Sequence, residues 1–120
     1  MRLEREVALV TGGSRSIGRA IALAFAREGA AVAVNYVSHA EEARSAVREI
    51  EALGRRAIAV KADTSQRVQI HAMVEEVTAR LGPIDVLVNN AGVQKRVFFL
   101  DLEEADWDWM LGVNLKGYFL

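Results

Sequence analysis

Residues 7–18 join a short apolar run to a glycine-rich turn and then to the start of a helix. An apolar pattern at spacings i, i+3, i+4 and i+7 begins at Ile17, directly after the turn. The first N–H groups of a helix lack partners inside it, and the aligned peptide dipoles place partial positive charge there. Glycine permits a tight turn and close approach of a ligand. The segment therefore predicts a phosphate-binding turn, or a ligand-free connection of the same shape.

The remaining chain repeats this alternation of strand and helix. Apolar strand patterns end near Val10, Val34, Val60 and Val88, and each gap has room for one crossover helix. The second run lacks polar alternation, which is typical of a strand covered on both faces. We expect an α/β fold in three αβα layers, a doubly wound parallel sheet of strand order 3-2-1-4. That order brings the loops 11–18 and 89–92 to one crevice.

Capping and turn residues predict where the helices begin and end. The first helix should stop at Gly29, and Ser38 with Glu41 reads as a capping box for the second. The second helix should place Leu53 in its buried stripe. Residues 63–65 offer caps for a third helix, and residues 84–88 form the fourth strand. A last helix should open at residues 101–104, and its apolar residues cover more than one face.

Composition excludes several function classes. The net charge of −1 argues against nucleic acid and anionic membrane surfaces as partners, and no apolar run is long enough to span a bilayer. The sequence contains no cysteine and opens without a secretory signal, which is typical of a cytoplasmic protein. His39 and His71 are isolated, so we expect solvated histidines and no metal site.

Two other nucleotide-binding classes fail on the residues of the turn. A P-loop needs a Gly-Lys-Ser/Thr ending, and a phosphoacceptor domain needs an acidic pair after its first strand; residues 11–18 offer neither. A dinucleotide site remains. In domains with such a site, the second strand usually ends in an acidic residue that binds the adenosine ribose. Here Asn35, followed by Tyr36, stands near that position. A neutral residue does not repel a 2′-phosphate, and Arg15 with Ser38 could bind one. This pattern favours NADP over NAD.

Four ordered motifs resemble those of the classical short-chain dehydrogenase/reductase family. They are the turn 11–18, Asp63 after the third strand, residues 89–92 after the fourth, and Asn114 in residues 113–117. The resemblance implies a Rossmann-type domain over residues 1–120 that corresponds to the first half of a longer family member, truncated before the later strands. The chain ends on large apolar residues without a cap, which leads us to expect a fragment.

The resemblance assigns roles to residues of the turn. Gly12 and Gly18 match the family's first and last glycines, which allow the tight turn and close helix–strand packing. Ser16 stands at the middle glycine, where its hydroxyl donates to a phosphate or its bulk weakens binding; the sequence leaves both open. Ile17 would offer a backbone N–H to the pyrophosphate.

Later motifs complete the implied site. Asp63, with Thr64, would bind the adenine amino group or cap a helix. Residues 89–92 would bridge loops beside the nicotinamide ribose, and Asn114 would position a water in a proton relay or only bend its helix. The candidate cofactor-binding residues are Gly12, Ser14, Arg15, Ser16, Ile17, Gly18, Asn35, Tyr36, Ser38, Asp63, Thr64, Asn89, Asn90, Ala91 and Gly92, and the catalytic candidate is Asn114.

The implied chemistry is hydride transfer between NADP(H) and a small carbonyl or alcohol substrate. Overall similarity is to 3-oxoacyl-carrier-protein reductases and to sugar or polyol dehydrogenases such as glucose 1-dehydrogenase. The family's Tyr-x-x-x-Lys pair is not found in these residues, so we predict that the 120 residues alone are inactive. A non-catalytic nucleotide-binding sensor or scaffold is the alternative. The family's matching helix contributes to a subunit interface, so a homo-oligomer, a tetramer or dimer, is expected; burial under further chain is the rival explanation.

Overall fold

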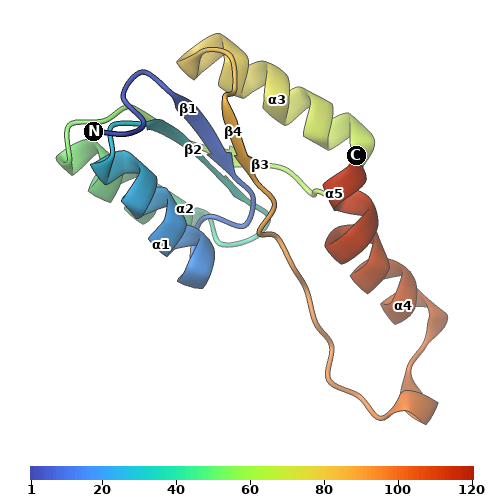
Figure 1. Ribbon diagram of the computed structural model, residues 1–120. Helices are drawn as coiled ribbons and strands as arrows, with labels where there is room; N and C mark the ends of the chain where they lie inside the picture. Colours follow the sequence, from blue (N-terminus) through green and yellow to red (C-terminus); the bar gives the residue numbers. More distant parts are fainter.

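The structure, a computed structural model, describes residues 1–120 (Figure 1). Its strands are β1 (Val7–Val10), β2 (Ala31–Tyr36), β3 (Ala57–Lys61) and β4 (Val86–Val88). Its main helices are α1 (Ser16–Arg27), α2 (Ala40–Ala52), α3 (Arg67–Leu81) and α4 (Glu104–Leu111). A short 3₁₀ turn, Phe99–Asp101, precedes α4. A π-helical segment, Gly112–Lys116, follows α4 and leads into α5 (Gly117–Phe119).

The four strands form one parallel sheet in the order β3-β2-β1-β4. In the central strand β1, Ala8 pairs with Val32 of β2 and with Val86 of β4. The predicted doubly wound order is thus confirmed. Because β1 and β4 are neighbours and parallel, the turns that follow them leave the sheet at the same edge.

Helices cover both faces of the sheet and bury its core, as the continuous apolar strands predict. Figure 1 shows α1 and α2 on one face and α3 on the other. One core cluster joins Ala8 and Val10 to α1 and to Ile50 of α2, and a second joins Leu9 to α3 through Val77. Successive residues of β1 point into opposite layers. The three-layer αβα arrangement is therefore confirmed.

Several local predictions are wrong at element ends. The residue before α2 is His39, and neither Ser38 nor any other side chain caps the helix, so the expected capping box does not form. Leu53 lies past the end of α2 and is exposed, because the helix closes one residue earlier. Strand β4 begins at Val86, two residues later than predicted; just before it, the Val7 N–H donates to the Asp85 carboxylate and the Asp85 N–H to the Val7 carbonyl, each at 2.9 Å. Gly29 ends α1 with φ +100°, as predicted.

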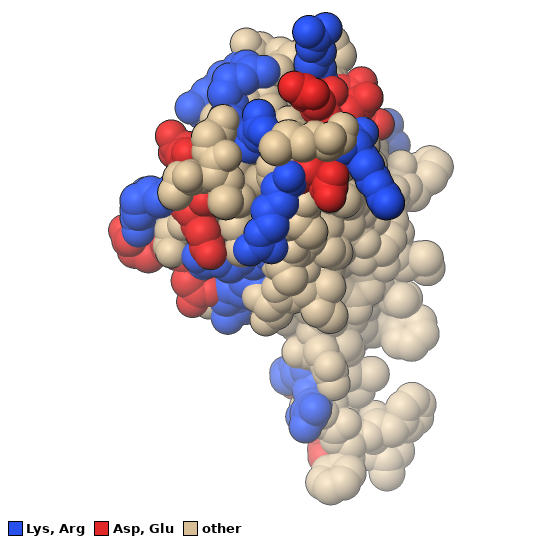
Figure 2. Space-filling view, turned by 60° about the vertical axis from the view of Figure 1, so that its left-hand side comes forward, with Lys and Arg blue, Asp and Glu red and all other residues tan.

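Residues 94–120, which we call the arm, project from the sheet (Figure 1). The molecule is therefore elongated and measures 50 × 25 × 24 Å. A capping box of Glu103 and Asp106 opens α4. The arm returns at α5, where a Cβ on Gly117 would meet the carbonyl of Thr64. Figure 2 shows acidic and basic side chains interspersed on the globular part. None of the helices combines the length and the apolar character that a bilayer crossing requires.

Candidate functional site

The glycine turn after β1 folds tightly against the loop that follows β4. Gly12 has φ +63°, in the left-handed region that favours glycine. A Cβ on Gly18 would collide with the carbonyl oxygen of Gly12 and with the side-chain amide of Asn90. Both glycines are therefore required by the fold of the turn, as their positions predict. Their close packing leaves the N-terminus of α1 open toward the pocket described below.

Thr11 and Asn90 join the two turns by hydrogen bonds. The Thr11 hydroxyl donates to the carbonyl oxygen of Val88 at 3.2 Å and accepts from the backbone N–H groups of Asn90 and Ala91, each at 3.0 Å. The Asn90 side-chain amide donates to the carbonyls of Thr11 and Gly12, each at 3.1 Å. The expected amide bridge between loops is therefore present, and it is made by Asn90.

A pocket of about 670 Å³ lies along the carboxyl ends of β1, β2 and β4. Asn89 is the one candidate cofactor-binding residue outside its wall. The structure does not bring Asn89 to this pocket with the others: Asn89 borders a smaller apolar cavity between β4, α3 and α5. Side chains alternate along the chain, so Asn89 and Asn90 leave β4 toward opposite sides. The candidates that line the pocket are Gly12, Ser14, Arg15, Ser16, Ile17, Gly18, Asn35, Tyr36, Ser38, Asp63, Thr64, Asn90, Ala91 and Gly92.

Ser16 adopts φ +52° at the first residue of α1. A side chain in this region costs about 1–2 kcal/mol relative to glycine. The conformation explains in physical terms why glycine is suited to this position. The Ser16 side chain is exposed at the pocket wall.

Asn35 is buried beneath the glycine turn, with 1% of its surface exposed. Its Oδ1 accepts from the N–H of Gly12 at 3.1 Å, and its Nδ2 donates to the carbonyls of Val60 and Ala62 at 3.3 and 3.1 Å. The prediction that Asn35 occupies the ribose-facing position is wrong, because both ends of its amide are engaged within the fold. The next residue, Tyr36, ends β2 and is only partly buried at the pocket wall, so its side chain is more accessible from the pocket than that of Asn35.

Arg15 stands beside the glycine turn at the end of the pocket that Ser38 also lines. Its Nε lies 3.4 Å from a carboxylate oxygen of Glu42, in the first turn of α2. About half of each side chain is exposed, so solvent screens the pair and leaves it weak. The guanidinium therefore remains available to an anion at this end of the pocket.

Asp63 forms a local turn with Ser65 at the end of β3. Its Oδ1 accepts from the backbone N–H of Ser65 at 2.9 Å and from the Ser65 hydroxyl at 2.7 Å. The residue before α3 is Gln66, so the helix-cap alternative for Asp63 is wrong. Asp63 lines the pocket together with the buried Thr64. Its second carboxylate oxygen has no recorded protein partner and can accept a hydrogen bond.

Asn114 lies in the π-helical segment and attaches the arm to the loop after β4. Its Oδ1 accepts from the backbone N–H of Val93 and its Nδ2 donates to the carbonyl of Val93, each at 2.8 Å. The predicted disturbance of the helix is confirmed, since a π segment replaces regular α-helix there. The Asn114 side chain is exposed.

Several residues of the pocket and its frame carry no motif signal. Trp109 and Val113, one helical turn apart on the arm, complete the pocket wall, and their position depends on how the arm returns to the sheet. Thr11 joins the two turns by its hydroxyl. The only sequence signal for this role is its position between a strand and a glycine. The other unpredicted lining residues are Val37, His39, Val93 and Gln94.

Sequence comparisons place these features in a family. The profile described as short chain dehydrogenase matches residues 6–120. The 3-oxoacyl-(acyl-carrier-protein) reductase FabG of Staphylococcus aureus (strain Mu50) is 46% identical over 112 residues, which cover 93% of this chain and 46% of the reductase. The chain thus spans about half the length of the curated relatives it matches.

Solved structures agree with the sequence matches. A short chain dehydrogenase from Burkholderia cenocepacia J2315 in complex with NADP superposes with a TM-score of 0.96 at 46% identity, over 99% of this chain and 49% of that one. A blue fluorescent protein from a metagenomic library in complex with NADPH superposes with a TM-score of 0.93 at 40% identity, with the same coverage. The chain belongs to the short chain dehydrogenase family.

Proposed function

We propose that this chain supplies the cofactor half of an NADP(H)-dependent oxidoreductase that transfers hydride between nicotinamide and a carbonyl or alcohol. The observation that carries the proposal is the pocket at the carboxyl ends of the parallel strands, which opens onto the free N-terminus of α1. Two structural relatives named for complexes with NADP and NADPH support the choice of ligand.

The residues of the pocket fit such a dinucleotide. Gly12 and Gly18 keep side chains away from the turn, so a pyrophosphate can reach the first N–H groups of α1, that of Ile17 included. Arg15 and Ser38 both line the pocket, which supports them as the residues that bind a 2′-phosphate. The free oxygen of Asp63 can accept from the adenine amino group. When bound, NADP(H) supplies the hydride acceptor or donor.

The loop after β4 forms the opposite wall of the pocket. Ala91 and Gly92 leave room beside it, and the Asn90 bridge keeps this wall rigid against the glycine turn. Asn114 holds the same loop through both backbone groups of Val93. We propose that Asn114 takes part in the proton relay and that turnover requires a Tyr-x-x-x-Lys pair, which these 120 residues do not contain.

We propose a 3-oxoacyl-carrier-protein reductase-like or sugar or polyol dehydrogenase-like activity for the whole protein. Similarity to FabG favours the first. Steady-state oxidation of NADPH with a 3-oxoacyl thioester, compared with reduction of NADP by glucose, distinguishes the two activities.

We also propose that the protein is a homo-oligomer and that it is cytoplasmic. The exposed apolar side chains of the arm, such as Phe119 at 80% exposure, support the homo-oligomer. Light scattering of the purified protein tests the assembly.

Calorimetric titration of the full-length protein tests the cofactor assignment. We expect 2′,5′-ADP to bind about tenfold or more tightly than 5′-ADP, because Arg15 adds a charge-assisted contact to the 2′-phosphate. Arg15→Ala should remove most of this difference, and Arg2→Ala, far from the pocket, should not. Equal affinities for the two nucleotides in the unmodified protein would contradict NADP preference, and no binding of either would contradict the proposed function.

The pocket also fits a second candidate, a non-catalytic nucleotide-binding sensor or scaffold. Both candidates predict NADP binding, so binding does not separate them. Single-turnover oxidation of bound NADPH by a carbonyl substrate does. Hydride transfer supports the oxidoreductase, whereas tight binding without any oxidation across the carbonyl panel supports the sensor or scaffold.

A further inference from the structure

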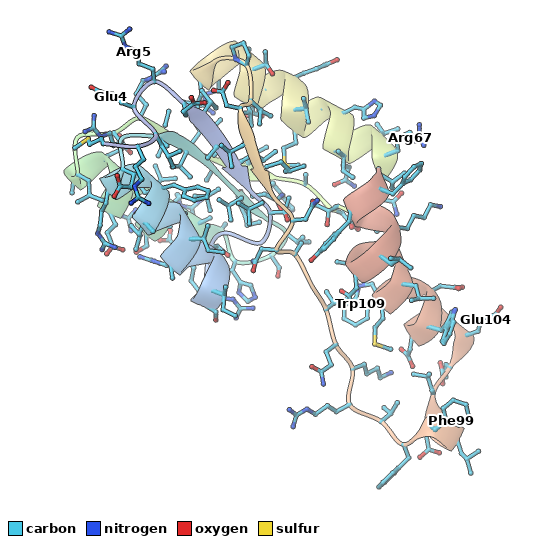
Figure 3. All side chains as sticks on the ribbon, viewed as in Figure 1. Glu4, Arg5, Arg67, Phe99, Glu104 and Trp109 are labelled. Carbon is cyan, nitrogen blue, oxygen red and sulfur yellow. The ribbon has the colours of Figure 1, made fainter.

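The arm carries the only two tryptophans of the chain, and they lie differently with respect to the pocket. Trp109 lines the pocket, whereas Trp107, two residues earlier in α4, borders none of the main cavities. Residues two apart on a helix do not share a face. Figure 3 shows Trp109 directed from α4 toward the segment that leaves β4. The two side chains are exposed to similar extents, 46% and 54%.

Trp109 lies on the same helix face as Val113, since the two are four residues apart. Val113 is buried in the pocket wall, and the more exposed indole of Trp109 continues this wall by one helical turn. Trp109 and Asp63 also share the rim of a second hollow on the other side of the arm. The indole and the Asp63 carboxylate therefore line the same two hollows.

This pairing suits a purine base. A flat aromatic face offers dispersion contact to any base, and the carboxylate beside it accepts from an exocyclic amino group. The indole is half exposed, so covering it with a base removes apolar surface from water. A phosphate at this edge has no apolar face with which to cover the ring.

We propose that Trp109 forms the outer wall of the adenine subsite and packs against the adenine ring of the bound dinucleotide. This inference rests on the proposed function and adds a binding residue to the same pocket. The arm then has a part in cofactor binding as well as in the attachment through Asn114. The adenine half of the cofactor should depend on Trp109, and the nicotinamide half should not.

Calorimetry with the two halves of the cofactor tests the assignment in the full-length protein. Trp109→Ala should weaken 2′,5′-ADP binding about tenfold and leave binding of reduced nicotinamide mononucleotide unchanged. Trp109→Phe, which keeps an aromatic face, should recover most of the affinity. Trp107→Ala is the matched control and should change neither affinity more than about twofold.

Tryptophan fluorescence gives a second readout. In Trp107→Phe, where Trp109 is the only indole of these 120 residues, 2′,5′-ADP should quench emission strongly; in Trp109→Phe this quenching should be lost. Unchanged 2′,5′-ADP affinity in Trp109→Ala, or a loss confined to the nicotinamide half, would overturn the inference and leave the proposed function intact. Failure of the unmodified protein to bind 2′,5′-ADP would instead overturn the proposed function and, with it, this inference.

Discussion

Ser16 shows how one residue links backbone conformation to the site. It is one of two non-glycine residues with positive φ; the other, Arg5 at φ +69°, lies at the opposite end of the sheet. Both carry a similar conformational cost, yet only Ser16 borders the pocket. Comparing substitutions at Ser16 and Arg5 therefore separates the effect of backbone strain on stability from the effect of the Ser16 hydroxyl on ligand binding.

Ser16→Gly should raise the free energy of unfolding by about 1 kcal/mol, because glycine adopts φ +52° without a Cβ clash. We expect NADPH affinity to be equal or higher in this variant. Urea denaturation and fluorescence titration measure the two effects. Arg5→Gly is the control, with a similar gain in stability and unchanged affinity. A clear loss of affinity in Ser16→Gly alone would show that the hydroxyl is a phosphate ligand.

The end of β2 separates two neighbouring residues with opposite roles. Tyr36→Asp should shift preference from NADP toward NAD, because a carboxylate at the pocket wall repels a 2′-phosphate and accepts from ribose hydroxyls. Asn35→Asp should instead lower the free energy of unfolding by about 3 kcal/mol, since it leaves the carbonyls of Val60 and Ala62 without their donor. Titrations with both cofactors, together with thermal unfolding, check the pair. A cofactor shift in a stable Asn35→Asp protein would contradict this reading.

At the scale of elements, the first turn of α2 faces the glycine turn through Glu42 and Arg15. A 2′-phosphate has to compete with Glu42 for the guanidinium. Glu42→Gln should therefore strengthen 2′,5′-ADP binding about two- to fivefold at low salt, with less effect at high salt. The adjacent Glu41 pairs with Arg44, so Glu41→Gln is the matched control. An equal gain in 2′,5′-ADP affinity in both variants would mean that the effect comes from the change in net charge and not from competition with Glu42 for Arg15.

Two side chains attach the arm to the loop after β4: Asn114 binds both backbone groups of Val93, and the Tyr118 hydroxyl donates to the carbonyl of Ala91 at 2.8 Å. Asn114→Ala removes both hydrogen bonds to the backbone of Val93, so the Val93 amide should exchange with solvent at least about fivefold faster. Hydrogen exchange followed by mass spectrometry or NMR measures this change. Asn89→Ala is the control, because no hydrogen bond is recorded for the Asn89 side chain. Unchanged exchange at Val93 would contradict the role of Asn114 as an attachment.

At the scale of the whole molecule, the two ends of the sheet differ in their chemistry. The carboxyl ends of the strands hold the pocket, whereas the amino ends gather charged residues, among them Glu6 and Asp85. The negative charge of Asp85 raises the pKa of Glu6 above its ordinary value of 4.5, with a smaller contribution from burial. The Val7 N–H holds Asp85 in place at 2.9 Å.

This repulsion predicts a pH effect on stability. A carboxyl with a raised pKa in the folded state favours folding when protonated, so its contribution is present at low pH and is lost as the pH rises through the raised value. Relative to the unmodified protein, Glu6→Gln should therefore be more stable at pH 7, with the difference shrinking toward pH 4. Urea denaturation across this range measures it. A difference that grows as the pH falls would contradict the assignment.

The sequence by itself determined the βα rhythm, the parallel sheet and most of the pocket wall, because these follow from local apolar periodicity and from glycines whose positions admit no side chain. Tertiary structure alone decided which face each polar residue presents. The Asn35 side chain lies inward against four backbone partners, Asn89 borders a different cavity, and Trp109 reaches the pocket through the return of the arm. These outcomes depend on contacts between residues far apart in the chain, which no local pattern encodes.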